Sequence, residues 1–174
     1  MQNIYERARR IRLAIFDVDG VLTDGALLFA GSGEELKVFH VLDGHGLKML
    51  QESGVTLAVI TSRASRAVEE RMRHLGIELV FQGVQDKLAA FNQLLAQQKM
   101  AAEAVSCIGD DLQDLPVMKR CGLAATVPDA PVLVRRHAHY VTRARGGQGA
   151  AREMCELIMH AQGSLAARIA AFLG

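Results

Sequence analysis

The sequence has 174 residues, half of them hydrophobic, so it is long enough for a single domain with a sizeable core over residues 1–174. The formal net charge is +1, no basic run is interleaved with aromatic residues, and no apolar run could cross a bilayer, so we expect neither nucleic acid nor membrane as a partner. The first residues lack the apolar core of a signal peptide and the three cysteines have no CxxC spacing, which favours a cytoplasmic protein with reduced thiols.

Apolar runs that predict strands alternate along the chain with amphipathic stretches that predict helices. The strand-like runs are almost continuously hydrophobic, which is typical of a parallel sheet covered by helices on both faces. The alternation therefore predicts a doubly wound, Rossmann-like α/β fold with a mostly parallel sheet. The predicted strands cover residues 13–18, 55–61, 78–83, 104–110, 123–127 and 139–142.

Helices are predicted between these strands where apolar residues recur at helical spacing. Gly54 and Gly76 lie where helices are expected to end, because glycine readily takes the left-handed conformation of a helix C-terminus. The expected buried faces are Val68, Met72 and Leu75 in one helix and Leu88, Phe91 and Leu95 in the next.

Two segments depart from the alternation. Residues 26–40 contain two short strand-like pieces on either side of Gly31-Ser32-Gly33, which predicts a β-hairpin flap. Residues 145–174 contain a glycine loop, "GGQGA", that leads into a helix, and then a last amphipathic piece that is apolar enough to pack.

Polar side chains follow four of the predicted strands. Because ligands bind beyond the carboxyl ends of parallel strands, we expect these side chains to converge on one edge of the sheet. Several carboxylates beside one lysine and one hydroxyl would repel one another without a hard cation, and Mg²⁺ is the usual ion for carboxylates and phosphate. The side chains concerned are Asp17, Asp19, Thr61, Ser62, Lys87, Asp110, Asp111 and Asp114.

This set of residues indicates phosphoryl transfer through an aspartyl nucleophile. Asp17 is the candidate nucleophile, since a metal and a lysine would offset the charge of a phosphate dianion. Asp19 lies two residues on, on the same side of an extended chain, and could protonate the leaving oxygen and later accept a proton from water. Gly20 allows a sharp turn, and the Asp19 carbonyl is a plausible metal ligand.

Other interpretations of these residues remain open. Asp111 and Asp114 could cap the helix that begins in "DDLQDLP", and Lys87 could be a surface lysine, although a cation in a first helical turn opposes the helix dipole. A phosphoacceptor signalling module also gathers aspartates, a threonine and a lysine on a parallel sheet. Such a module has no second acid two residues after its acceptor, so D-x-D-G at Asp17 favours an enzyme.

The segments "DVDGVLTDG", "TSR", Lys87 and "GDDLQD" resemble, in order and spacing, the four motifs of the haloacid dehalogenase superfamily. The resemblance implies an aspartyl-phosphate intermediate and Mg²⁺ held by Asp17, Asp110 and the Asp19 carbonyl. It also implies a phosphate-binding Thr61 and a shielding Lys87, with Asp111 and Asp114 in support.

Residues 8–163 are similar to one family within it, the phosphatases of the eight-carbon sugar acid phosphate 3-deoxy-D-manno-octulosonate (KDO) 8-phosphate, of lipopolysaccharide synthesis. That family has no separate cap domain, and neither gap between motifs could hold one here. The resemblance implies a homotetramer in which the hairpin and glycine tail help close a neighbour's site. Arginine suits the substrate carboxylate, which assigns Arg63 and Arg71 to substrate binding. Together with two motif residues, the predicted substrate-binding set is Asp19, Arg63, Arg71 and Lys87.

Two alternatives to this activity remain. Phosphatases of related nine-carbon keto-sugar acid phosphates carry a glutamate where Arg63 stands, so the arginine favours the eight-carbon substrate. A non-catalytic phosphatase-like domain is the other alternative, and the complete set of motifs argues against it.

Overall fold

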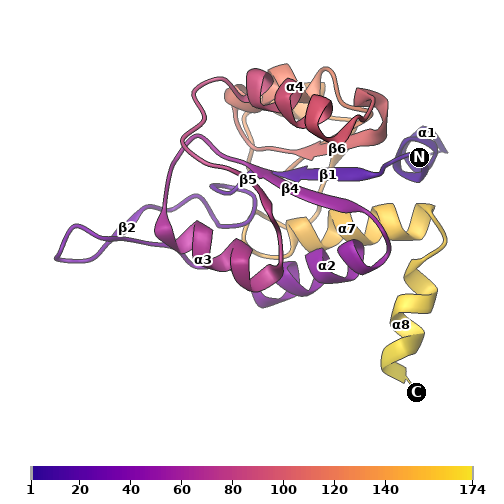
Figure 1. Ribbon diagram of the computed structural model, residues 1–174, viewed down its shortest axis with the longest axis horizontal. Coiled ribbons are helices and arrows are strands. Elements are labelled where there is room, and N and C mark those ends of the chain that lie inside the picture. Colours follow the sequence, from indigo (N-terminus) through magenta and orange to yellow (C-terminus); the bar gives the residue numbers. More distant parts are fainter. Residues whose placement is uncertain (1, 174) are drawn as a thin grey trace.

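The fold is described by a computed structural model that covers residues 2–173. Six parallel strands form one sheet in the order β5-β4-β1-β6-β7-β8, which confirms the predicted doubly wound fold (Figure 1). β1 lies at the centre, and Phe16 near its end pairs in register with Val59 and Ile108 of its two neighbours. The strands are β1 (Leu13–Phe16), β4 (Thr56–Ile60), β5 (Leu79–Phe81), β6 (Val105–Ile108), β7 (Leu123–Thr126) and β8 (Tyr140–Val141).

Helices cover both faces of the sheet. Figure 1 shows α4 above it and α2 and α7 below it. Gly54 and Gly76 follow helix ends with positive φ angles, as predicted. None of the described helices is long and apolar enough to span a bilayer. The helices are α1 (Gln2–Arg9), α2 (Val41–Glu52), α3 (Arg66–Leu75), α4 (Lys87–Gln98), α5 (Leu115–Met118), α6 (Val132–His137), α7 (Ala150–Ala161) and α8 (Leu165–Leu173), with 3-10 turns at Ala102–Ala104 and Leu112–Asp114.

The buried face of α3 is the predicted one, but that of α4 is rotated. Val68, Met72 and Leu75 are all buried. In α4 the buried residues are Lys87, Ala90, Phe91 and Leu94, whereas Leu88 and Leu95 are half-buried. The buried residues of α4 follow the i, i+3, i+4, i+7 spacing of a helix face, but the first of them is charged. A prediction from apolar residues alone therefore began this face at Leu88, one position too late.

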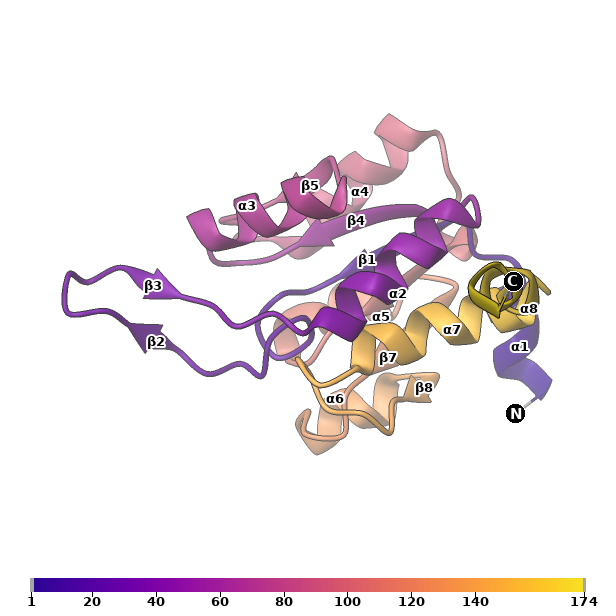
Figure 2. The same ribbon diagram turned by 90° about the horizontal axis from the view of Figure 1, so that it is seen from below.

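The hairpin predicted at residues 26–40 is present as β2 (Leu28–Phe29) and β3 (Glu35–Leu36), which pair antiparallel. Figure 2 shows it reaching away from the body of the domain. Its apolar side chains are exposed: Leu28 by 52%, Phe29 by 56% and Val38 by 73%. No further domain lies over the sheet edge in the described part of the chain.

The C-terminal segment consists of a glycine loop that packs on the domain and a last helix, α8, that is mostly exposed. The glycine loop packs against the loop that follows β1, and Gly147 donates a backbone hydrogen bond to Val21 over 2.9 Å. The prediction that the last amphipathic piece packs is wrong for most of α8, in which no residue is buried and Phe172 is 68% exposed. Among the described residues, the apolar side of α8 contacts the rest of the domain through Leu165, which packs against the core, and through a ring contact between His45 and Phe172.

Replacing Gly146 with alanine should lower the free energy of unfolding by about 1–3 kcal/mol. A Cβ atom there would lie 1.9 Å from the Gly20 carbonyl oxygen, which is backbone and cannot turn aside. Urea denaturation measures the change. Gly31→Ala is the matched control, since nothing lies within 4 Å of a Cβ at that hairpin position; equal stability of the two variants would contradict the packing.

Candidate active site

The polar residues predicted at the strand ends do converge. They line one pocket of about 180 Å³ at the carboxyl edge of β1, β4 and β6. Arg71 is the one predicted site residue that does not line this pocket. The lining residues are Asp17, Asp19, Gly25, Thr61, Ser62, Arg63, Lys87, Asp110, Asp111, Gln113 and Asp114.

Asp17 and Lys87 form a buried ion pair at the floor of this pocket. Asp17 follows β1 directly; its Oδ1 accepts the Val18 amide over 2.7 Å and its Oδ2 lies 2.8 Å from Lys87 Nζ. Lys87 is only 6% exposed, so it is not a surface lysine. Burial lowers the pKa of Lys87, but the charges of Asp17 and Asp114 outweigh it and raise that pKa above its ordinary value.

Asp114 holds both the lysine and the loop after β6. Its Oδ1 accepts from Lys87 Nζ over 2.7 Å, and its Oδ2 accepts the amides of Asp110 and Asp111 over 3.0 and 3.1 Å. Asp111 is exposed and caps the Leu112 amide over 2.7 Å. The capping interpretation is therefore confirmed for both aspartates, and Asp114 in addition contacts Lys87.

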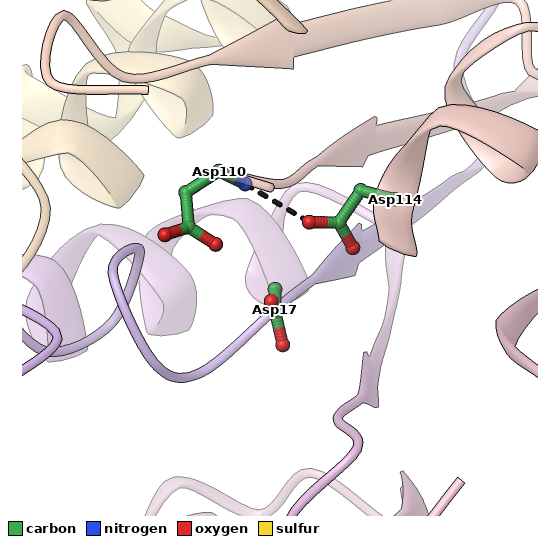
Figure 3. A group of neighbouring side chains, drawn as sticks. All are labelled: Asp17, Asp110 and Asp114. Carbon is green, nitrogen blue, oxygen red and sulfur yellow. Dashed lines mark hydrogen bonds between the residues drawn. The ribbon is translucent and has the colours of Figure 1, made fainter. Parts of the chain in front are cut away.

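Asp17, Asp110 and Asp114 each place one carboxylate oxygen within 4.8 Å of the others (Figure 3). Burial, then the charge of Asp114, raise the pKa of Asp17 to about 6. Burial, then the charge of Asp17, raise the pKa of Asp110 to about 7. Within residues 2–173 no donor hydrogen-bonds the Asp110 carboxylate; Asp17 accepts one backbone amide, whereas Asp114 accepts two and thereby holds the loop after β6. The donor set therefore fits a divalent cation between Asp17 and Asp110.

The backbone of Gly20 lies directly against this cluster. A Cβ atom at Gly20 would lie 2.0 Å from Asp110 Oδ2, and Gly20 has a φ of +83°. Only glycine allows this close approach of the loop after β1, and its positive φ provides the sharp turn that the sequence predicted. Thr61, which is 2% exposed, bounds the pocket from the end of β4.

Asp19 belongs to a ring of alternating charges, here called the charge ring, made of Asp19, Lys37, Glu35 and Arg63. Lys37 Nζ contacts Asp19 Oδ1 and lies 2.6 Å from Glu35 Oε1. Arg63 Nη2 lies 2.5 Å from Glu35 Oε2, and Arg63 Nε lies 3.9 Å from Asp19 Oδ2. The sequence prediction missed Glu35 and Lys37, although charges at alternate positions of an extended segment lie on the same side.

Arg71 and Asp43 lie away from the pocket. The Arg71 guanidinium lies 5.8 Å from the centre of the Phe39 ring and does not line this pocket, so its contact with substrate stays a prediction. Asp43, which the sequence did not single out, is 2% exposed and accepts the amides of Gly149 and Arg152 over 3.1 and 2.8 Å. It thereby fixes the start of α7 and the glycine loop before it.

Comparison with known proteins gives a consistent result. A family model for haloacid dehalogenase-like hydrolases matches residues 34–127. The 3-deoxy-D-manno-octulosonate 8-phosphate phosphatase of Yersinia pestis is 48% identical, over 94% of this chain and 87% of its own length. The Moraxella catarrhalis phosphatase of the same name, solved with a magnesium ion, a phosphate ion and KDO, is 42% identical with a TM-score of 0.97 over 99% of both chains. A probable phosphatase structure from Pseudomonas syringae is 52% identical with a TM-score of 0.98, over 100% of this chain and 99% of its own.

Binding of Mg²⁺ should weaken roughly tenfold between about pH 8 and about pH 6. The pKa values of Asp17 and Asp110 are raised to about 6 and about 7, so both carboxylates take up protons as the pH falls through this range, and these protons must leave before a cation binds. Isothermal titration calorimetry measures the affinity. Asp110→Asn should bind weakly at either pH, and Asp24→Asn, which changes an exposed side chain and keeps the acceptor of the Ala26 amide, should behave as the natural protein. An affinity independent of pH would contradict this account.

Proposed function

The chain belongs to the haloacid dehalogenase-like hydrolases, in the family of 3-deoxy-D-manno-octulosonate 8-phosphate phosphatases, and on that premise we propose that it hydrolyses KDO 8-phosphate to KDO and phosphate. The observation that carries the proposal is the meeting of Asp17, Asp19 and Lys87 in one small pocket beside a carboxylate cluster. Mg²⁺ is the cofactor, and the carboxylates of Asp17 and Asp110 with the Asp19 carbonyl would hold it. When bound, it supplies positive charge that stabilises the transferring phosphoryl group.

The first step transfers the phosphoryl group to the enzyme. An Asp17 carboxylate oxygen attacks phosphorus, the bond from phosphorus to the sugar oxygen breaks, and that oxygen takes a proton from the Asp19 carboxyl group. Lys87, held 2.8 Å from Asp17, offsets negative charge on the reacting groups. The Thr61 hydroxyl donates a hydrogen bond to a phosphoryl oxygen.

The second step releases phosphate. Asp19, now a carboxylate, takes a proton from water, and the water oxygen attacks phosphorus of the aspartyl phosphate. The bond between phosphorus and the Asp17 oxygen breaks, which returns Asp17 to its carboxylate form and restores the proton on Asp19. Exclusion of bulk water during the first step protects the intermediate.

The rest of the site recognises the sugar acid. Arg63 lies at the pocket with a side chain 44% exposed, where its planar guanidinium can bind the substrate carboxylate. Arg71 lies outside this chain's own pocket, so its contact with substrate would be made across a subunit boundary.

Four copies of the chain would close the site. The support for this homotetramer is the absence of a cap over the pocket in residues 2–173, together with the exposed apolar side chains of Leu28, Phe29 and Val38 on the hairpin. The hairpin reaches away from the body of the domain, where it would help close a neighbour's site together with the glycine tail. The glycine loop itself contacts the loop that follows β1, here called the catalytic loop. We place this tetramer in the cytoplasm. Sedimentation equilibrium would measure its mass and so test for four copies of the chain.

Phosphate release from a panel of sugar phosphates, with Mg²⁺ or with a chelator, tests the activity. KDO 8-phosphate should be hydrolysed faster than a nine-carbon keto-sugar acid phosphate or glucose 6-phosphate, and the chelator should abolish turnover. Asp17→Asn should keep the fold and lower turnover at least about a thousandfold. Asp24→Asn, an exposed aspartate of the same loop, should not. Preference for the nine-carbon substrate, or release from none of them, would overturn the proposal.

A further inference from the structure

Lys37 occupies an unusual place for a lysine on an exposed hairpin. Its side chain is only 2% exposed, although the next residue, Val38, is 73% exposed. Burying an ammonium group is unfavourable unless opposite charges compensate it. The compensating carboxylates are Asp19 and Glu35, which come from the catalytic loop and from the hairpin itself.

The contact with Asp19 distinguishes the two oxygens of that carboxyl group. Lys37 Nζ contacts Oδ1, whereas Oδ2 faces Arg63 at 3.9 Å and Arg63 lines the pocket. Asp19 is 22% exposed and lies on a loop, so without the lysine its side chain could adopt other rotamers. The lysine therefore holds Asp19 in the rotamer in which Oδ2 faces Arg63, and both of these residues line the pocket.

We propose that Lys37 is a positioning residue that orients Asp19 for proton transfer to the leaving sugar oxygen. The inference rests on the function proposed above, in which Asp19 gives its proton to that oxygen as the bond to phosphorus breaks. Glu35 keeps Lys37 in place and ties the charge ring to the hairpin, because it contacts Lys37 at 2.6 Å and Arg63 at 2.5 Å. The hairpin thus acts on the chemistry of its own chain.

Such a role depends on the leaving group. A sugar alkoxide needs a proton as it departs, whereas p-nitrophenolate leaves without one, so misplacing the acid slows only the first substrate. Lys37→Met keeps the length of the side chain and removes its charge. We expect it to slow release of KDO from KDO 8-phosphate by about 10- to 100-fold and release of p-nitrophenol from p-nitrophenyl phosphate by less than about threefold.

The measurement is the first-turnover rate by rapid quench, with Mg²⁺ and saturating substrate, so that the second step and substrate affinity do not enter. Asp19→Asn should show the same selective loss. Lys48→Met, which alters an exposed lysine of α2, should leave both rates unchanged. Equal slowing of both substrates by Lys37→Met, or slowing of neither, overturns the positioning role.

Failure of the proposed function and unfolding of the variant can each be told apart from failure of the positioning role. If the natural protein releases no KDO, the proposed function fails before the role of Lys37 is in question. If Lys37→Met loses its circular dichroism spectrum, Lys37→Gln gives the same comparison, because it removes the charge, keeps a polar side chain and leaves the pair of Glu35 and Arg63 intact. A selective loss on KDO 8-phosphate in that variant supports the proposal, and a uniform loss or none overturns it.

Discussion

The burial of three mutually repelling carboxylates beside a single ammonium group is the constraint on which the rest of this structure depends. Asp17 and Asp114 both contact Lys87, and Asp110 lies within reach of both without a donor of its own among residues 2–173. Left alone, this arrangement favours protonated carboxyl groups, and the pKa of Asp110 is raised to about 7 chiefly by burial. A divalent cation would reverse that balance, because it stabilises the ionised carboxylates. The negative charge that is unfavourable without a cation is therefore what binds one.

The backbone had to approach closely for these charges to meet. Parallel pairing brings the ends of β1 and β6 together, and Gly20 and Gly109 then leave no room for side chains, with a Cβ 2.0 Å from Asp110 and 2.2 Å from Asp114 respectively. Gly146 completes the packing against Gly20 from the far end of the chain. The catalytic loop is thus held by β6 on one side and by the glycine loop on the other.

Hydrophobic periodicity and the positions of the strand ends predicted most of the fold and the pocket. Continuous apolar runs identified all six strands of the sheet, and D-x-D-G after the first of them located the pocket. Lys37 and Asp43 were missed, because each acts on a partner distant in sequence and neither belongs to a chemical motif. The placement of Arg71 and of α8 could not be predicted either, since both depend on which surfaces the folded chain leaves uncovered and apolar spacing does not report that.

The cation site is the claim most directly open to measurement. A crystal structure grown with Mn²⁺ at about pH 8, where carboxylates compete well for metal, would locate the ion by its anomalous scattering. This account predicts one anomalous peak between the carboxylates of Asp17 and Asp110, with Lys87 still in its ion pairs with Asp17 and Asp114. No peak there, or side chains at residues 17 and 110 that point away from each other, would contradict it.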